Sequence, residues 1–407
     1  AGSCLHNTFK RIKNAFKQGL LRHSNLVESF KFRYVGPVDG NDVLSLVAVL
    51  RDLREIKGPK LLHTITTKGK GFEAAEQNPV LWHAPGKYDP ATGELIRNKG
   101  AGDKFQDVFG QTLVDLAKAD GRIVGVTPAM PTGCSMDLLA KAMPERYFDV
   151  GIAEGHAVTF SAGLACEGLV PFCNIYSTFM QRAYDNVIHD VALQGLGVVM
   201  CLDRGGLVGE DGATHHGAYD MAYMSCVPGL TIAAPYDELE LRNMMYTAST
   251  AGSPWVIRYP RGCGSGIEWR DVPFEKVGVG VGRCLRKGSG VAVLSVGAIG
   301  IIASQAVERA VAEGADPAHY DMRWVKPLDE SILRAIVEGG FERVVTVEDG
   351  SLAGGVGQQI EIRLRDMGFA GKVVRLGIPD RFIEHATPAQ LYAECGIDAE
   401  SIYKAIM

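Results

Sequence analysis

From Lys104 onward, apolar residues recur in two patterns: short β-branched runs and longer runs at helical spacing. The short runs predict strands and the longer ones predict helices. The predicted order is helix 105–119, strand 123–126, helix 136–143, strand 148–150, helix 154–166, strand 169–174, helix 177–193 and strand 198–202. This alternation is typical of a doubly wound α/β domain built on a parallel sheet, which we assign to residues 103–275.

A second, smaller α/β domain is predicted over residues 276–407. Its apolar runs predict strands at 291–296, 321–324, 344–348 and 373–376. Runs at helical spacing predict helices at 301–313, 329–339 and 354–367. The chain therefore carries two consecutive α/β domains after a different N-terminal region.

The first 102 residues lack this regular alternation. Residues 1–35 carry seven Lys or Arg against one acid, and Phe9, Ile12, Phe16 and Leu20 recur at helical spacing. This pattern predicts an amphipathic basic helix, better explained by packing on a larger body than by a membrane-surface or nucleic-acid role. A helix at 43–56 and a strand at 61–65 follow. Residues 73–102 are rich in Pro, Gly and Asn, so we expect an exposed linker or a functional loop.

Composition narrows the class of protein. A net charge of −5 gives no general reason to bind nucleic acid or anionic membrane. No apolar run approaches the roughly 20 residues that span a bilayer. The nine cysteines include no Cys-x-x-Cys pair and no metal-ligand spacing, so we expect reduced thiols, a cytoplasmic location and no metal site within this chain.

Polar residues with possible chemistry follow the predicted strands of residues 103–275. Because ligands of parallel sheets bind at the carboxyl ends of the strands, we expect these residues to lie together. They are Glu154, Tyr176, Phe179, Arg182, Asp203, Arg204, Glu210, Asp211, His215, His216, Arg258 and Arg261.

Each of these residues also has a plain structural explanation. Glu154 begins a helix of small, apolar residues. The helix dipole favours a glutamate in the first turn, so the dipole explains this position as well as a functional role does. Phe179 lies in a helical run and, taken alone, is more typical of a core residue. Arg258 and Arg261 fit surface salt bridges, although Pro260 between two guanidinium groups favours a phosphate. The joint occurrence of these residues favours a functional site.

Several motifs make the sequence resemble the 1-deoxy-D-xylulose-5-phosphate synthase family of thiamine-diphosphate enzymes. The resemblance runs from about Asn7 to the C-terminus. It rests on GPVDGND, TTKGKG, WHAPGKYD, DVGIAEGHAV, YSTFMQRAYD, DRGGLVGEDGATHHGAYD, RYPRG, VKPLDE and GIPDRFIEHA. The loop that holds Asp211 and His215 separates this family from ordinary transketolases, so the match is specific.

The resemblance implies a fold and a cofactor. Residues 103–275 would form the pyrimidine-binding domain, residues 276–407 the transketolase C-terminal domain, and residues 1–102 the remnant of a diphosphate-binding domain plus a linker. Glu154 would contact the aminopyrimidine of thiamine diphosphate, Phe179 would stack on that ring, and Arg182 would also bind the cofactor. Burial disfavours the charged form of a carboxyl group, so a buried glutamate can share a proton with the cofactor ring. This role would explain a lone glutamate among small, apolar residues.

The resemblance also implies two substrates, pyruvate and glyceraldehyde 3-phosphate, joined with loss of carbon dioxide. Arg204 and Arg261, helped by Tyr176, would bind the phosphate of the second substrate. Three further residues would act close to the reacting carbons: Asp211, His215 and His83. His216 is interpreted as structural. The family forms dimers, so a homodimer is expected.

The chain departs from the family in one respect. It contains no Gly-Asp-Gly element, with which the family binds Mg²⁺ and the diphosphate. We therefore expect the metal ligands outside this chain and weak activity from the chain alone. Two alternatives stay open: the pyrimidine-domain subunit of a 2-oxo acid dehydrogenase, and a non-catalytic remnant that binds a phosphorylated metabolite.

Overall fold

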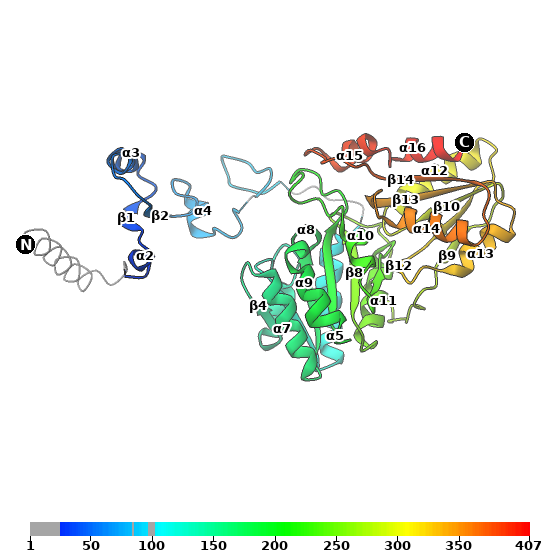
Figure 1. Ribbon diagram of the computed structural model, residues 1–407, viewed down its shortest axis with the longest axis horizontal. Helices are drawn as coiled ribbons and strands as arrows, with labels where there is room; N and C mark the ends of the chain where they lie inside the picture. The colour runs from blue at the N-terminus through cyan, green and yellow to red at the C-terminus, as the bar shows by residue number, and fades with distance from the viewer. Residues whose placement is uncertain (1–24, 84, 97–101) are drawn as a thin grey trace, which may run out of the picture. The chain divides into compact units, whose positions relative to one another are not determined.

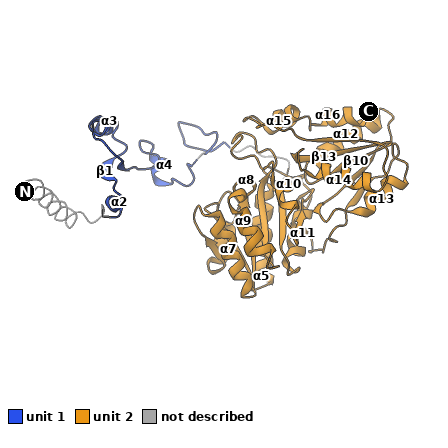
Figure 2. Ribbon diagram, viewed as in Figure 1, with its two compact units in different colours: residues 1–99 blue, residues 100–407 orange. Residues whose placement is uncertain are grey.

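The computed structural model describes residues 25–83, 85–96 and 102–407 (Figure 1). The basic helix expected over residues 9–20 lies outside the described residues. The chain divides into two compact units, residues 1–99 and residues 100–407, and each is described by itself (Figure 2). In the described part of the chain, no helix has both the length and the apolar character that crossing a membrane requires.

The first unit contains a small parallel sheet and short helices. Strands β1 (Arg33–Asp39) and β2 (Lys60–Ile65) pair in parallel. Helix α3 (Val43–Arg54) connects them, and the Asp42 side chain caps it by accepting from two backbone N–H groups. Helices α2 (Asn25–Ser29) and α4 (Glu73–Gln77) flank this pair in sequence. Strand β1 was not predicted, and α4 lies in the segment predicted to lack regular structure.

The second unit is built on two sheets, and its α/β class with parallel sheets is confirmed. The seven-stranded sheet has the order β12-β7-β8-β6-β5-β3-β4 and is parallel except for β12. Its strands are β3 (Ile123–Thr127), β4 (Tyr147–Asp149), β5 (Val170–Tyr176), β6 (Val199–Gly205), β7 (Thr231–Ala233), β8 (Trp255–Pro260) and β12 (Trp324–Lys326).

Helices cover both faces of this sheet because successive strand residues point to opposite sides. Phe172 of β5 packs in a core with α5 (Phe105–Ala119), α6 (Asp137–Ala142) and α11 (Glu238–Ser249). The next residue, Cys173, packs in the opposite core with α7 (Glu154–Cys166), α8 (Ser177–Met180) and α10 (Asp220–Ser225).

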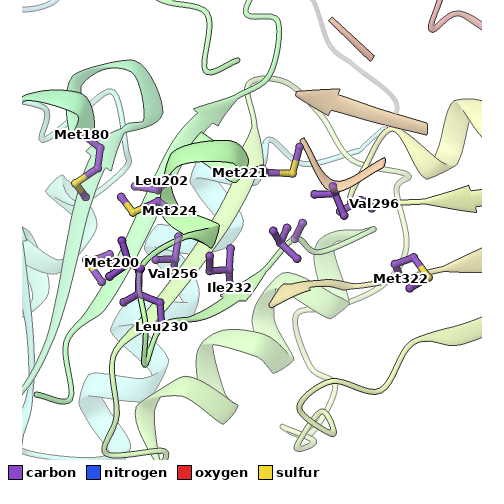
Figure 3. Close-up of a cluster of buried hydrophobic side chains, with 14 of the residues drawn as sticks. Met180, Met200, Leu202, Met221, Met224, Leu230, Ile232, Val256, Val296 and Met322 are labelled. Atoms are coloured by element: carbon purple, nitrogen blue, oxygen red, sulfur yellow. The ribbon is translucent and has the colours of Figure 1, made fainter. Parts of the chain in front are cut away.

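The five-stranded sheet has the order β14-β13-β10-β11-β9, with only β9 antiparallel. Its strands are β9 (Arg283–Arg286), β10 (Val291–Ser295), β11 (Ala318–Asp321), β13 (Arg343–Ser351) and β14 (Lys372–Ile378). Its helices are α12 (Gly300–Ala312), α13 (Glu330–Glu338), α14 (Val356–Asp366), α15 (Pro388–Cys395) and α16 (Ala399–Ile406). One apolar cluster spans both domains of this unit: it contains Met200 of β6 and Met224 of α10, together with Val296 after β10 and Met322 after β11 (Figure 3).

Two elements that were each predicted as continuous are divided in the structure. The strand expected at 321–324 is two strands in different sheets, because Arg323 adopts a left-handed backbone with φ 58° that ends β11 and turns the chain into β12. The single helix expected at 177–193 is a succession of α8, a 3-10 turn (Gln181–Ala183), α9 (Tyr184–Asn186) and a π-helical segment (Val187–Ala192). Such π segments are frequent at functional sites.

A buried histidine makes the stability of the second unit depend on pH. His319 of β11 is 1% exposed. Its Nε2 lies 2.9 Å from Ser295 Oγ and its Nδ1 lies 3.3 Å from Ser304 Oγ. Burial disfavours the imidazolium form and lowers the pKa of His319 from 6.5 to about 4.

We expect the wild type to lose about 3 kcal/mol of unfolding free energy, relative to His319→Gln, as pH falls from about 6.5 to about 4. The unfolded chain binds a proton on His319 in this window that the folded chain excludes, so lower pH favours unfolding. Urea unfolding of both proteins at several pH values measures the difference. Identical pH slopes for the two proteins would contradict the prediction.

Candidate active site

The carboxyl ends of four strands, β4, β5, β6 and β8, bring the candidate residues to one edge of the seven-stranded sheet. Tyr176 ends β5 and lies in register with Asp203 of the parallel strand β6. Gly205 at the end of β6 lies in register with Pro260 at the end of β8. Glu154 begins the helix that follows β4. The carboxyl ends of the strands therefore form the site, as expected for an open parallel sheet.

Glu154 is a buried carboxylate at the first position of α7. It is 4% exposed, and Arg182 Nη1 donates a hydrogen bond of 2.6 Å to its Oε1. Arg182 itself is largely exposed at 59% of its side chain. The preceding apolar residue Ile152 is 84% exposed. A carboxylate withdrawn from water thus lies beside an accessible guanidinium.

Phe179 is the centre of an aromatic group. Its ring stacks against Tyr176 with centroids 5.8 Å apart and meets His215 edge-on at 5.3 Å. The Arg182 guanidinium carbon lies 5.1 Å from the Phe179 ring centroid. Because Arg182 also binds Glu154, it connects the buried carboxylate with this aromatic group.

Arg204 packs on the Tyr176 ring and binds its own neighbour. Its guanidinium carbon lies 4.2 Å from the ring centroid, and its Nη1 lies 2.9 Å from Asp203 Oδ1. Burial raises the pKa of Tyr176 to about 12, so its hydroxyl is a neutral donor at physiological pH. One cation and one neutral hydroxyl are therefore held together at the ends of β5 and β6.

Arg261 and Asp211 form an ion pair. Arg261 Nη1 donates to Asp211 Oδ2 at 2.6 Å and to the Val208 carbonyl at 3.0 Å. Both side chains are partly exposed, at 37% and 44%. The structure thus brings these two residues together and leaves them open to solvent.

The two adjacent histidines have different surroundings. His215 contacts the Thr214 hydroxyl through Nδ1 at 2.8 Å and presents its ring to Phe179. His216 is buried; its Nδ1 accepts from the Val208 N–H at 3.1 Å and its Nε2 lies 3.3 Å from the Glu384 carbonyl. Burial lowers the pKa of His216, which favours the neutral ring with Nε2–H donating. His216 thereby connects the loop after β6 to the segment that follows β14.

The interpretation of Arg258 as a phosphate ligand is wrong. Arg258 is 3% exposed and its Nε donates to Asp220 of α10, while its Nη1 donates to Asp349 Oδ1 at 2.5 Å. Arg261 follows the end of β8 and binds Asp211 and the Val208 carbonyl instead, so the two guanidinium groups do not act as a pair. Arg258 instead links the two domains of the second unit.

His83 belongs to the first unit, so the structure does not place it relative to the other candidates. Its side chain is exposed. In the described residues, no group of three or more His, Cys, Asp or Glu side chains has the arrangement of a metal site.

The sequence analysis assigned no role to Asp203, although it named this residue. Asp203 is fully buried, and burial raises its pKa to about 6. A signal was available: Asp203 directly continues the apolar run of a predicted strand, where an acid is costly unless it has a partner.

Three family models match the chain. A model described as 1-deoxy-D-xylulose-5-phosphate synthase matches residues 1–66, the transketolase pyrimidine binding domain matches residues 104–264, and the transketolase C-terminal domain matches residues 280–402.

Curated relatives extend this likeness over nearly the whole chain. The chain is 54% identical to a 1-deoxy-D-xylulose-5-phosphate synthase of Phocaeicola vulgatus over 98% of its own length and 63% of the relative's. It is 48% identical to the synthase of Chlorobaculum tepidum over 100% of its own length and 64% of the relative's. The chain therefore spans less than two thirds of the length of these relatives.

Two solved structures share the fold. One is named a split gene transketolase, inactive β4 tetramer; it is 27% identical with a TM-score of 0.65, and the match covers 75% of this chain and 97% of that one. The other, a transketolase from Leishmania mexicana, has a TM-score of 0.62 at 18% identity over 76% of this chain and 46% of that one, and shows the fold alone.

Proposed function

We propose that this chain, a member of the 1-deoxy-D-xylulose-5-phosphate synthase family, forms the pyrimidine-binding and C-terminal part of a thiamine-diphosphate-dependent transferase. The proposed reaction joins pyruvate to glyceraldehyde 3-phosphate with loss of carbon dioxide and yields 1-deoxy-D-xylulose 5-phosphate. The observation that carries the proposal is the buried Glu154, connected through Arg182 to an aromatic group that Arg204 extends. The matches to the two transketolase domain models support the assignment of residues 103–275 and 276–407.

The residues present fit the aminopyrimidine part of the cofactor. Glu154 offers a carboxylate withdrawn from water for a ring nitrogen, and Phe179 offers an aromatic face. When bound, thiamine diphosphate supplies the carbon nucleophile that permits cleavage next to the carbonyl of a 2-oxo acid. Glu154 would hold the proton that it shares with the ring nitrogen, and Arg182 Nη1 orients its Oε1. We propose that Mg²⁺ and the diphosphate bind in the part of the relatives that this chain does not match.

The phosphate of the second substrate would bind at Arg204, Arg261 and Tyr176. The guanidinium of Arg204 is fixed against the Tyr176 ring, and Arg261 is positioned by Asp211. Guanidinium groups form strong charge-assisted hydrogen bonds with phosphate oxygens. Tyr176 adds a neutral hydroxyl donor.

Proton transfer near the acceptor aldehyde would fall to Asp211 and His215. His215 lies against Phe179, where the proposed cofactor ring stacks, and Asp211 is partly exposed beside Arg261. Both side chains can deliver or accept a proton at the new hydroxyl. We also propose that His83, from the first unit, approaches the substrate in the complete enzyme.

The proposal is tested with this chain combined with the part of the Phocaeicola vulgatus relative that it does not match, called the reconstituted enzyme below. We expect pyruvate consumption that depends on glyceraldehyde 3-phosphate and little turnover by the chain alone. Consumption with a lipoyl acceptor instead would favour a 2-oxo acid dehydrogenase subunit. Phosphate binding without any turnover would favour a non-catalytic remnant.

Replacing Arg261 by methionine is expected to raise the KM for glyceraldehyde 3-phosphate by about 10- to 100-fold, because hydrogen bonds to a charged group are lost. The KM for pyruvate should stay unchanged. Steady-state kinetics of the reconstituted enzyme with each substrate varied measures both values. Arg122→Met is the matched control, since Arg122 forms a similar ion pair with Asp120 at 2.7 Å but lies before β3, at the opposite end of the strands. Equal KM values for both variants would count against the phosphate site.

We also propose a cytoplasmic location and a homodimer. The eight cysteines of the described residues are free thiols, which is typical of a reducing compartment. The homodimer is proposed from the resemblance to a family whose members form dimers. Sedimentation of the reconstituted enzyme measures its assembly.

A further inference from the structure

We propose that Asp203 is a positioning residue that fixes the Arg204 guanidinium over the Tyr176 ring and thereby sets the affinity for the phosphate of the acceptor substrate. This inference rests on the proposed function and assigns a role to a residue that does not itself touch the substrate. It follows from the backbone of Arg204, the contacts of the Asp203 carboxylate and the polar atoms around them.

The backbone at Arg204 brings two neighbouring side chains together. Successive residues of a strand point to opposite faces of the sheet, so Asp203 and Arg204 of a regular β6 would not form an ion pair. Arg204 instead has φ 60°, a left-handed conformation that few residues other than glycine adopt. Such conformations concentrate at functional sites, where the surrounding structure maintains them. Here the strained backbone directs the guanidinium towards Asp203.

The Asp203 carboxylate maintains this conformation through two contacts. Its Oδ1 accepts the backbone N–H of Arg204 at 2.7 Å and lies 2.9 Å from Arg204 Nη1. Asp203 thus contacts both the backbone and the guanidinium group of Arg204. The Tyr176 ring packs on the guanidinium at 4.2 Å, so the group is restrained by a carboxylate and by a ring.

Arg204 keeps donor capacity that Asp203 does not use. Although Arg204 Nη1 is close to Oδ1, it is buried without an aligned hydrogen-bond acceptor in the described part of the chain, and Asp203 Oδ2 is likewise unpartnered. Buried donors without a partner are rare in folded proteins and call for an explanation. A phosphate oxygen arriving at Arg204 would supply an acceptor for such a donor. The arrangement is that of a prepared anion ligand rather than of a closed ion pair.

The charge state of Asp203 agrees with this role. Burial raises its pKa to about 6, while Arg204 opposes that rise, so the carboxylate is mostly ionised at neutral pH. The titratable side chains that interact electrostatically with Asp203 include Arg204, Asp107, Tyr176, Tyr259, Cys134 and Cys201. Arg204 is the cation among them, and it faces the carboxylate directly.

The test replaces Asp203 by asparagine in the reconstituted enzyme. We expect the KM for glyceraldehyde 3-phosphate to rise about 10-fold, with the KM for pyruvate close to wild type, and thermal unfolding checks that the variant folds. In an Arg204→Met background the same substitution should have no further effect, since Asp203 acts through Arg204. Asp203→Glu, which keeps the charge but displaces it, should also raise this KM. Asp120→Asn is the matched control, because it disrupts an Asp–Arg pair at the opposite end of the sheet.

A second measurement needs no turnover. Inorganic phosphate is titrated into the full chain while the ¹⁵N–¹H signal of Arg204 Nε is followed by NMR. We expect the signal to shift in the wild type and the apparent affinity to fall about 10-fold in Asp203→Asn. If the wild type makes no product but this loss is seen, the proposed reaction fails and the role of Asp203 stands. Unchanged phosphate affinity in Asp203→Asn and Asp203→Glu, or additive effects with Arg204→Met, would overturn it.

Discussion

Replacing Glu154 with glutamine is expected to lower kcat of the reconstituted enzyme by about 100- to 10,000-fold, the usual contribution of a positioned acid or base. Glutamine keeps the size of the side chain and can still accept the hydrogen bond from Arg182 Nη1. It cannot share a proton with a ring nitrogen as a carboxylate can. The substitution therefore removes the proposed chemistry and preserves the packing of α7.

Glu167→Gln is the control on the same helix. Glu167 is the exposed C-cap residue of α7, so its replacement changes the net charge equally without reaching the site. Both variants are compared at saturating cofactor and substrates, and thermal unfolding checks that they fold. If Glu154→Gln retained turnover within a factor of about three, below the range that acid–base groups supply, the cofactor role of Glu154 would be rejected.

The sequence best predicts those elements whose apolar residues form a clear pattern and are buried in a hydrophobic core. The bounds of α5 and α7 agree with the prediction, because α5 carries apolar residues at helical spacing and α7 consists mainly of small and apolar residues. The apolar runs of β5 and β6 are equally clear, since both parallel strands are buried and rich in apolar residues. Local pattern and tertiary packing agree in these elements.

Helix α11 shows why other elements were missed. Its buried residues include Glu238, Glu240 and Arg242, which an apolar pattern cannot detect. Glu238 accepts hydrogen bonds from the backbone N–H groups of Ser265 and Gly266, far away in sequence. Glu240 and Arg242 likewise bind the distant residues Arg323 and Asp115, and no periodicity reports such contacts.

The sequence predicts which strand ends form the candidate site, but not which side chains contact one another there. The parallel sheet brings the ends of β5, β6 and β8 together, which the alternation of strands and helices already implies. The left-handed backbone of Arg204 near the end of β6 and the contact between Arg261 and Asp211 in the following loops are not set by this alternation. The RYPRG motif suggested two equivalent arginines, whereas burial assigns Arg258 to the interface between domains.

Arg258 shows how the two α/β domains are held as one unit. It projects from β8 and binds Asp220 on α10 of the same domain and Asp349 on β13 of the other. Its Nη2 also donates to the Asp349 carbonyl at 3.1 Å. All three side chains are almost fully buried, so the two carboxylates depend on one guanidinium for compensation.

Replacing Arg258 with methionine is expected to destabilise the chain by about 3–5 kcal/mol, because two carboxylates stay buried without a cation. Denaturant unfolding of the full chain measures the loss. Arg270→Met is the matched control: Arg270 pairs with Asp103 at 2.6 Å but is 54% exposed, so it should cost less than about 1 kcal/mol. Adding Asp220→Asn and Asp349→Asn to Arg258→Met should restore part of the stability, since the uncompensated charges are then gone. A loss below about 1 kcal/mol, as for an exposed pair, would show that this contact does not hold the domains together.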